Sequence, residues 1–202
     1  MKKSKNLLRI LYDWVLNWAY SPYGTLALFL IAFAESSFFP IPPDVLLIAL
    51  SISSNKKAYK FAIFCAIGSV LGGILGYLIG VFFYETVGVK IIEFYHLKKE
   101  FNIVGEQYRK NAFLAIFIAG FTPIPYKVFT IAAGVFHNMV PLSILVMASV
   151  WGRSLRFFLV ATILYFFGEK TKIFIDRYFN LLTIIFAVLL ILGFVLIPKI
   201  FH

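Results

Sequence analysis

The sequence Phe-Pro-Ile-Pro-Pro-Asp at residues 39–44 and the sequence Thr-Pro-Ile-Pro-Tyr-Lys at residues 122–127 each interrupt a long apolar segment. Aligning one copy with the other places Asp44 opposite Lys127, and neighbouring aliphatic residues also align, which indicates an internal duplication. Proline breaks a helix because it lacks a backbone N–H and its ring clashes with the preceding turn. Prolines and charges within apolar repeats are typical of transport sites. The interrupting prolines are Pro40, Pro42, Pro43, Pro123 and Pro125.

Composition predicts an all-α integral membrane protein. Apolar residues make up 61% of the 202 residues and charged residues only 14%, which lies outside the range of soluble domains. The net charge of +10 comes from basic residues spread among apolar spans, which argues against a nucleic-acid partner. The single cysteine, Cys65, and three widely separated histidines predict no disulfide, metal or other cofactor.

Both proline-broken segments, about residues 24–54 and 111–140, are too short for two full crossings. Each holds roughly 30 residues, whereas two membrane-spanning helices need about 40. Each is therefore expected to form a re-entrant hairpin of two half-helices. Non-helical backbone at membrane depth needs protein or a wet cavity to satisfy its hydrogen bonds, so both breaks should face the interior.

The remaining segments complete two repeats within one membrane domain, residues 1–202. Repeat 1, about 5–84, contains an amphipathic helix over 5–20, the first hairpin, and a transmembrane helix over 58–84. Repeat 2, about 88–168, contains a surface helix over 88–103, the second hairpin, and a transmembrane helix over 141–168. An additional transmembrane helix is expected over about 178–198.

The lysines at 56, 57 and 60 and the basic residues near 170–177 favour a cytoplasmic N-terminus. With one crossing between them, the two hairpins would enter from opposite faces as inverted repeats, an architecture typical of transporters.

Two carboxylates flank the first break. Glu35 lies in an apolar half-helix before Pro40, and Asp44 directly follows Pro43. Burial favours the neutral form of a carboxyl group, so we expect both residues to carry protons. The alternative for Asp44 is a helix-start anion that is stabilised by the helix dipole.

Three cations are the candidate site for an anionic headgroup: Lys127, Arg153 and Arg156. Lys127 lies in the first turn after the second break, where the helix dipole disfavours a cation. Arg153 and Arg156 lie near the middle of an apolar segment and, three residues apart, share one helix face. Their guanidinium groups could bind a phosphate, or they could pair with Glu35 and Asp44 in a network that holds the repeats together.

The first transmembrane segment carries a glycine at every fourth position, at residues 68, 72, 76 and 80. This spacing predicts a helix-packing face rather than a phosphate-binding loop, because the segment is continuous apolar helix.

The chain resembles the DedA superfamily, also called the VTT or SNARE-associated Golgi protein family, in particular a branch with the motif Phe-Thr-Pro-Ile-Pro-Tyr-Lys. The resemblance rests on the block from Glu35 to Asp44, on Gly76-Tyr77 and Gly80, and on Phe121-Thr122-Pro123 followed by Ala133-Gly134. It implies a multi-pass bacterial inner-membrane protein whose relatives move phospholipids or polyprenyl phosphates between leaflets, some with dependence on the proton gradient. Gly120 stands where the family usually has an arginine, and Arg153 and Arg156 could supply that charge.

These observations predict a non-enzymatic flippase or scramblase whose partners are membrane lipids, acting passively or coupled to protons. The sequence leaves open whether the chain forms a homo-oligomer. The alternatives are a proton-coupled exchanger of small ions and a membrane-integrity protein that transports nothing.

Overall fold

The computed structural model describes residue 18, residues 21–84, residue 86, residues 89–94 and residues 98–168. Every regular element in these residues is helical, as the composition predicted. The amphipathic helix expected over 5–20 falls outside them except at Trp18, and the additional transmembrane helix expected over 178–198 falls outside them altogether. The elements are α2 (Gly24–Ser37), α3 (Asp44–Ser53), η1 (Asn55–Lys57), α4 (Ala58–Phe82), α5 (Val89–Phe94), α6 (Lys98–Phe121), α7 (Tyr126–Val135) and the helix Leu142–Gly168.

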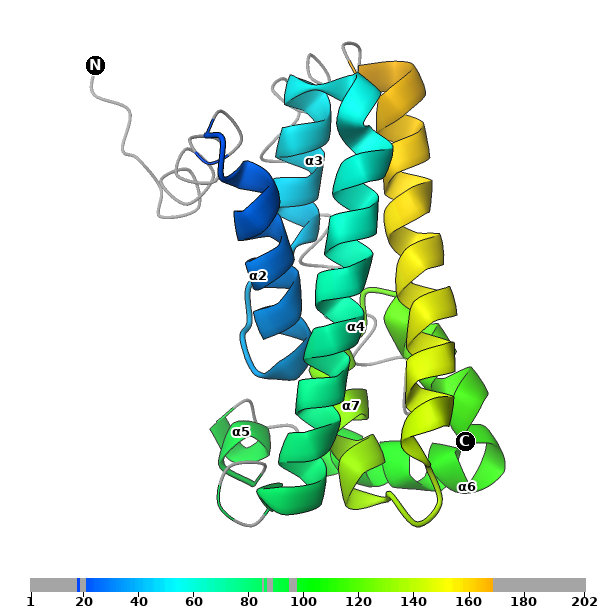
Figure 1. Cartoon of the computed structure of the whole chain (residues 1–202). Coiled ribbons are helices and arrows are strands. Elements are labelled where there is room, and N and C mark those ends of the chain that lie inside the picture. The colour runs from blue at the N-terminus through cyan, green and yellow to red at the C-terminus, as the bar shows by residue number, and fades with distance from the viewer. Residues whose placement is uncertain (1–17, 19–20, 85, 87–88, 95–97, 169–202) are drawn as a thin grey trace, which may run out of the picture.

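Two helices are long and apolar enough to cross a membrane. They are Asn55–Phe82, which joins η1 to α4, and Leu142–Gly168, with 28 and 27 residues. They run antiparallel and side by side along the height of the molecule (Figure 1). Tyr59 near the start of α4 packs against Phe158 and Tyr165 in the second half of Leu142–Gly168, with tilted rings whose centroids are 6.2 and 5.3 Å apart. Both helices were predicted at these positions.

The first proline break separates α2 from α3. The two helices lie side by side and are connected at their lower ends in Figure 1. α2 has 14 residues and α3 has 10. α2 ends at Ser37, before the proline-rich link, and Pro43 precedes the first residue of α3, Asp44. Proline is suited to this position because its fixed φ matches the helix and its missing N–H would have no helical partner there.

The second proline break separates α6 from α7. α6 contains a kink at Asn111, whose φ of −162° and ψ of 96° are not helical. The Asn111 side-chain oxygen accepts a hydrogen bond from the Leu114 backbone N–H at 3.0 Å, so it caps the part of α6 that leads to the break. Of the surface helix expected over 88–103, the described residues are helical, as α5 and the start of α6.

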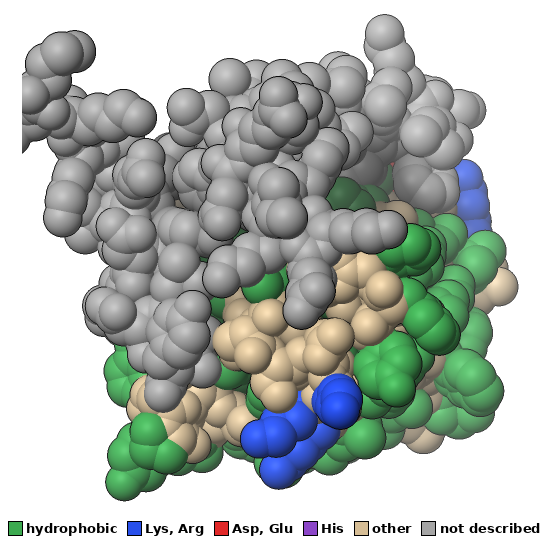
Figure 2. All heavy atoms as spheres, turned by 90° about the horizontal axis from the view of Figure 1, so that it is seen from above, with side chains coloured by type: hydrophobic (Ala, Val, Ile, Leu, Met, Phe, Trp, Pro, Cys, Tyr) green, Lys and Arg blue, Asp and Glu red, His purple; other side chains and the backbone are tan. Residues whose placement is uncertain are grey.

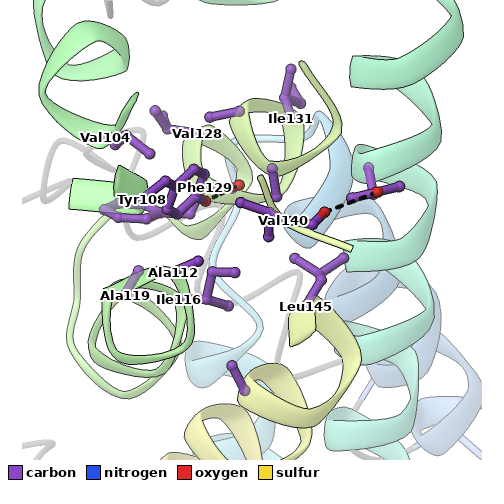
Figure 3. Close-up of a cluster of buried hydrophobic side chains, with 14 of the residues drawn as sticks. Val104, Tyr108, Ala112, Ile116, Ala119, Val128, Phe129, Ile131, Val140 and Leu145 are labelled. Atoms are coloured by element: carbon purple, nitrogen blue, oxygen red, sulfur yellow. Dashed lines mark hydrogen bonds between the residues drawn. The ribbon is translucent and has the colours of Figure 1, made fainter. Parts of the chain in front are cut away.

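α7 lies in the centre of the protein. This helix has 10 residues, and all of them except the last, Val135, are buried. Its hydrophobic side chains pack with those of α4, α6 and the start of the helix Leu142–Gly168 (Figure 3). The Tyr108 hydroxyl donates to the Phe129 carbonyl oxygen at 2.5 Å, and the Tyr77 hydroxyl donates to the Val140 carbonyl oxygen at 3.0 Å. The helix that follows the second break is therefore enclosed, whereas the break itself is not fully buried, because Pro123 is exposed.

Lysine side chains lie exposed where α3 passes into α4, at Lys56, Lys57 and Lys60. Figure 2 looks onto the upper end of the molecule, and its uncovered surface shows Lys and Arg side chains beside extensive hydrophobic ones.

The glycines of α4 form the predicted packing face. A Cβ at Gly68 or Gly72 would lie 2.5 or 2.0 Å from a carbonyl oxygen of α2, and one at Gly80 would lie 2.1 Å from the Ile131 oxygen of α7. α4 therefore contacts α2 with its first half and α7 with its second half. Because the helix backbones touch, only glycine fits at these positions.

We expect Gly72→Ala and Gly80→Ala each to lower the free energy of unfolding by about 1–3 kcal/mol, the usual cost of overpacking. The added methyl group meets backbone atoms, so two helices must separate. Gly120→Ala is the matched control, because its Cβ would find its nearest neighbour at an ordinary 3.5 Å. Thermal unfolding of the purified proteins in detergent measures the effect. Equal stability of all three variants would refute the packing argument.

Candidate functional site

The two proline breaks contact one another through α7, although Phe39, Pro40 and Pro123 are themselves exposed. The Lys127 ammonium donates to the Phe39 carbonyl oxygen in the first break at 3.2 Å. One helical turn further along α7, the Thr130 hydroxyl donates to the Ser36 carbonyl oxygen at 3.0 Å. Ser36 lies in the last turn of α2, where helix carbonyls lack partners within the helix, and Phe39 lies in the link that follows. α7 therefore satisfies backbone groups that the first break leaves open.

Arg153 joins the helix Leu142–Gly168 to the end of α2. Its Nη2 donates to Glu35 Oε2 at 2.7 Å. Its Nε donates to the Ser69 hydroxyl of α4 at 2.5 Å, and that hydroxyl also contacts the Ser36 hydroxyl at 2.7 Å. The Arg153 side chain is 2% exposed and that of Glu35 is 14% exposed. The ion pair is therefore nearly enclosed and held by two serine hydroxyls, that of Ser36 next to Glu35 on α2 and that of Ser69 on α4.

Aromatic rings hold the Arg153 guanidinium in place. The rings of Tyr126 and Phe157 have their centroids 4.9 and 4.8 Å from its central carbon, a distance at which a cation is attracted to the ring face. The Tyr126 hydroxyl bonds in turn to Ser149, one turn before Arg153 on the same helix. Gly120 lies beside the stem of Arg153, and a Cβ at Gly120 would meet its Cγ and Cδ at 3.6 Å, an ordinary contact distance.

Arg156 connects the two breaks directly. Its Nε and Nη2 donate to the two carboxylate oxygens of Asp44 at 3.0 and 2.8 Å. Its Nη1 donates to the Thr122 carbonyl oxygen, directly after the end of α6, at 2.7 Å. The side chains of Arg156 and Asp44 are each 15% exposed. One guanidinium thus ties the start of α3 to the end of α6.

All five ionisable residues singled out in the sequence gather around the two breaks. Of the two arrangements considered for the arginines, the structure shows the pairing with Glu35 and Asp44. Lys127 is buried and interacts electrostatically with Glu35. The five prolines lie in or beside the two links, with Pro43 and Pro125 directly before α3 and α7. Among the described residues, no group of acidic, histidine or cysteine side chains could hold a metal.

Sequence reasoning missed the neutral side chains of the site. They are Ser36, Ser69, Tyr126, Thr130 and Ser149. Two signals were present in the chain: Ser36 directly follows Glu35, and Ser69 directly follows the first glycine of the packing face. A hydroxyl next to a close helix contact is well placed to bond to the neighbouring helix, so Ser69 in particular could have been proposed.

The family model described as VTT domain matches residues 41–166. The chain belongs to the VTT domain family. The matched range contains Asp44, Lys127 and both arginines of the site, and it begins after Glu35. The family match and the two long apolar helices together identify the chain as a membrane protein of this family.

Two relatives of this VTT domain chain are described only as uncharacterized proteins. The one from Haemophilus influenzae is 39% identical over 162 residues, which is 79% of this chain and 82% of the relative. The one from Histophilus somni is 38% identical over 160 residues, with the same two shares. No solved structure matches. The function of this VTT domain must therefore be inferred from its own geometry.

We expect Thr130→Val to destabilise the protein by about 1–3 kcal/mol, because it keeps the side-chain shape but leaves the Ser36 carbonyl oxygen without its donor. Thr162→Val is the matched control. The Thr162 hydroxyl bonds only within its own helix, to Phe158. Denaturation in detergent compares the two variants, and a Thr162 variant that is equally unstable would contradict a special role for the bond between α7 and α2.

Proposed function

We propose that this VTT domain protein moves anionic lipid headgroups, those of phospholipids or polyprenyl phosphates, between the two leaflets of the bacterial inner membrane. The observation that supports this proposal is the pair of carboxylate–guanidinium contacts at the meeting point of the two breaks. Each contact joins helices from different halves of the chain. Guanidinium forks bind phosphate with the same bidentate geometry that they use for carboxylate, so a headgroup can take the place of a carboxylate.

The proposed architecture is that of two inverted repeats. α2, α3 and α7 have 14, 10 and 10 residues, fewer than the roughly 20 that span a bilayer. In this proposal, α2 with α3 and the end of α6 with α7 form re-entrant hairpins, and the helices Asn55–Phe82 and Leu142–Gly168 cross the membrane. The hairpins then present their broken ends to one another at mid-membrane, where transporters of this type bind their substrates.

The carboxylates give the proposed site a route to proton coupling. While Glu35 and Asp44 are ionised, each neutralises an arginine. Protonation would remove that negative charge and leave the guanidinium free to bind a phosphate. Lys127, Arg153 and Arg156 are the proposed headgroup-binding cations, and the half-helix α3 directs its positive N-terminal end toward the same region. Moving a lipid between leaflets requires no bond breakage, so we propose a transporter and not an enzyme.

The test is lipid movement in vesicles that contain the purified full-length protein. Fluorescent phospholipid or fluorescent polyprenyl phosphate is placed in both leaflets, and an impermeant quencher is added outside. Accessibility is expected to rise from about half of the label toward all of it for at least one of the two lipids. Protein-free vesicles and an Arg109→Ala protein, which changes an exposed arginine on α6, serve as controls.

The same vesicles distinguish the other candidate functions. If the accessible fraction of both lipids stays at half while an imposed pH gradient drives a small ion across the membrane, the protein is an ion exchanger. If neither lipid nor ion moves, a membrane-integrity role without transport replaces the proposal.

A further inference from the structure

The two ion pairs of the site differ in how firmly they are held. Arg153 is 2% exposed, stacks between two rings, and bonds to Glu35 and Ser69. The groups that hold it come from α2, α4, α7 and its own helix. Removing Glu35 from this guanidinium would leave a charge enclosed with no anion beside it, which is among the most unfavourable arrangements in a protein interior.

The pair formed by Arg156 and Asp44 has more access to the surroundings. Each side chain is 15% exposed. Among the described residues, the hydrogen bonds of the Arg156 guanidinium go to acceptors at the two breaks, to Asp44 and to the Thr122 carbonyl oxygen. A phosphate that replaced Asp44 would keep the guanidinium neutralised, because it presents two anionic oxygens in the same fork geometry.

Opening this second pair also has a mechanical consequence. Arg156 is the group that ties the start of α3 to the end of α6. When it transfers to a phosphate, the first and second breaks lose that bridge. They keep the contacts from Lys127 to Phe39 and from Thr130 to Ser36. The breaks can then separate locally around the headgroup while the rest of the interface stays closed.

We propose that the two pairs have different tasks: Arg156 releases Asp44 to bind a phosphate group, while the pair of Arg153 and Glu35 stays closed and holds the two halves together. This inference rests on the proposed function and narrows its headgroup-binding cations to Arg156. The ligand chemistry is a phosphate with free anionic oxygens, whether it is carried by a lipid or free in solution.

Binding to the detergent-purified full-length protein tests the assignment without any transport step. Dihexanoyl phosphatidic acid, a short-chain lipid phosphate, is titrated by calorimetry into the wild type, Asp44→Asn, Asp44→Asn/Arg156→Gln and Ser69→Ala. Asp44→Asn frees the Arg156 fork and is expected to tighten binding at least ten-fold, and the added Arg156→Gln is expected to remove the gain. Ser69→Ala frees the Arg153 Nε and is expected to change affinity less than two-fold while lowering thermal stability.

Each outcome decides a specific point. Tighter binding in Ser69→Ala, or unchanged affinity in Asp44→Asn, would overturn the division of tasks. Equal competition by inorganic phosphate would support the site and identify free phosphate as its source. Lipid movement that fails in vesicles while Asp44→Asn binds tightly would overturn the proposed function and leave the phosphate site standing. If Asp44→Asn does not purify as a folded protein, Arg156→Lys replaces it, and binding must then weaken at least five-fold.

Discussion

Replacing Glu35 with glutamine is expected to destabilise the protein by about 3–5 kcal/mol, the usual effect of removing one partner from a buried ion pair. The substitution keeps the shape of the side chain and removes its charge. Arg153, which is 2% exposed, would then lack its ion-pair partner in surroundings where water cannot replace it. The measurement is the free energy of unfolding, or the thermal midpoint, of the purified protein in detergent.

Glu106→Gln is the matched control, because Glu106 is exposed on α6 and surface charges contribute at most about 1 kcal/mol. A second variant distinguishes the loss of the ion pair itself from the cost of leaving the Arg153 charge buried without an anion. Removing both charges, in Glu35→Leu/Arg153→Met, is expected to recover much of the stability, since apolar pairs often replace buried ion pairs at no net cost. A double variant that is less stable than Glu35→Gln would contradict this explanation and indicate that the hydrogen bonds to Ser69 and Ser36 dominate.

Replacing Arg156 with lysine is expected to slow lipid movement about ten- to hundred-fold while the protein remains folded. Lysine keeps the positive charge but loses the planar fork that reaches both Asp44 oxygens and the Thr122 carbonyl oxygen. Loss of one or more charge-assisted hydrogen bonds would weaken headgroup binding by about 1.5–3 kcal/mol. Each 1.4 kcal/mol is about a factor of ten in affinity. The initial rate of label accessibility in the vesicle assay measures the effect.

The Arg109→Ala protein, tested in parallel, should move lipid at the wild-type rate, because Arg109 is exposed and lies before the Asn111 kink, in the part of α6 that does not lead into the break. Wild-type movement in Arg156→Lys would show that charge alone is sufficient and that the fork geometry has no role. Loss of movement in both variants would point to a nonspecific effect of basic residues on reconstitution.

The positions of the broken and continuous helices could be predicted from the sequence because their causes are local. A proline removes a backbone donor wherever it stands, so both breaks were found at the correct residues. The two long apolar segments matched Asn55–Phe82 and Leu142–Gly168 closely. Glycine at every fourth position of α4 indicated a close contact, and α2 and α7 both approach it there. The kink at Asn111 within α6 was not predicted, because apolar spacing alone does not locate where a helix is interrupted.

The sequence by itself determined which chemistry the interior contains: two carboxylates, three cations and two proline breaks, each placed by local pattern. Only the tertiary structure decided which groups meet. Glu35 and Arg153 lie 118 residues apart in the chain, and Asp44 and Arg156 lie 112 apart. Contacts at such separations depend on how whole helices pack, and the charges alone would equally allow either carboxylate to pair with either arginine. The packing of α7 against the ends of α2 and α6 selects one pairing, encloses Arg153, and leaves Arg156 as the bridge between the two breaks.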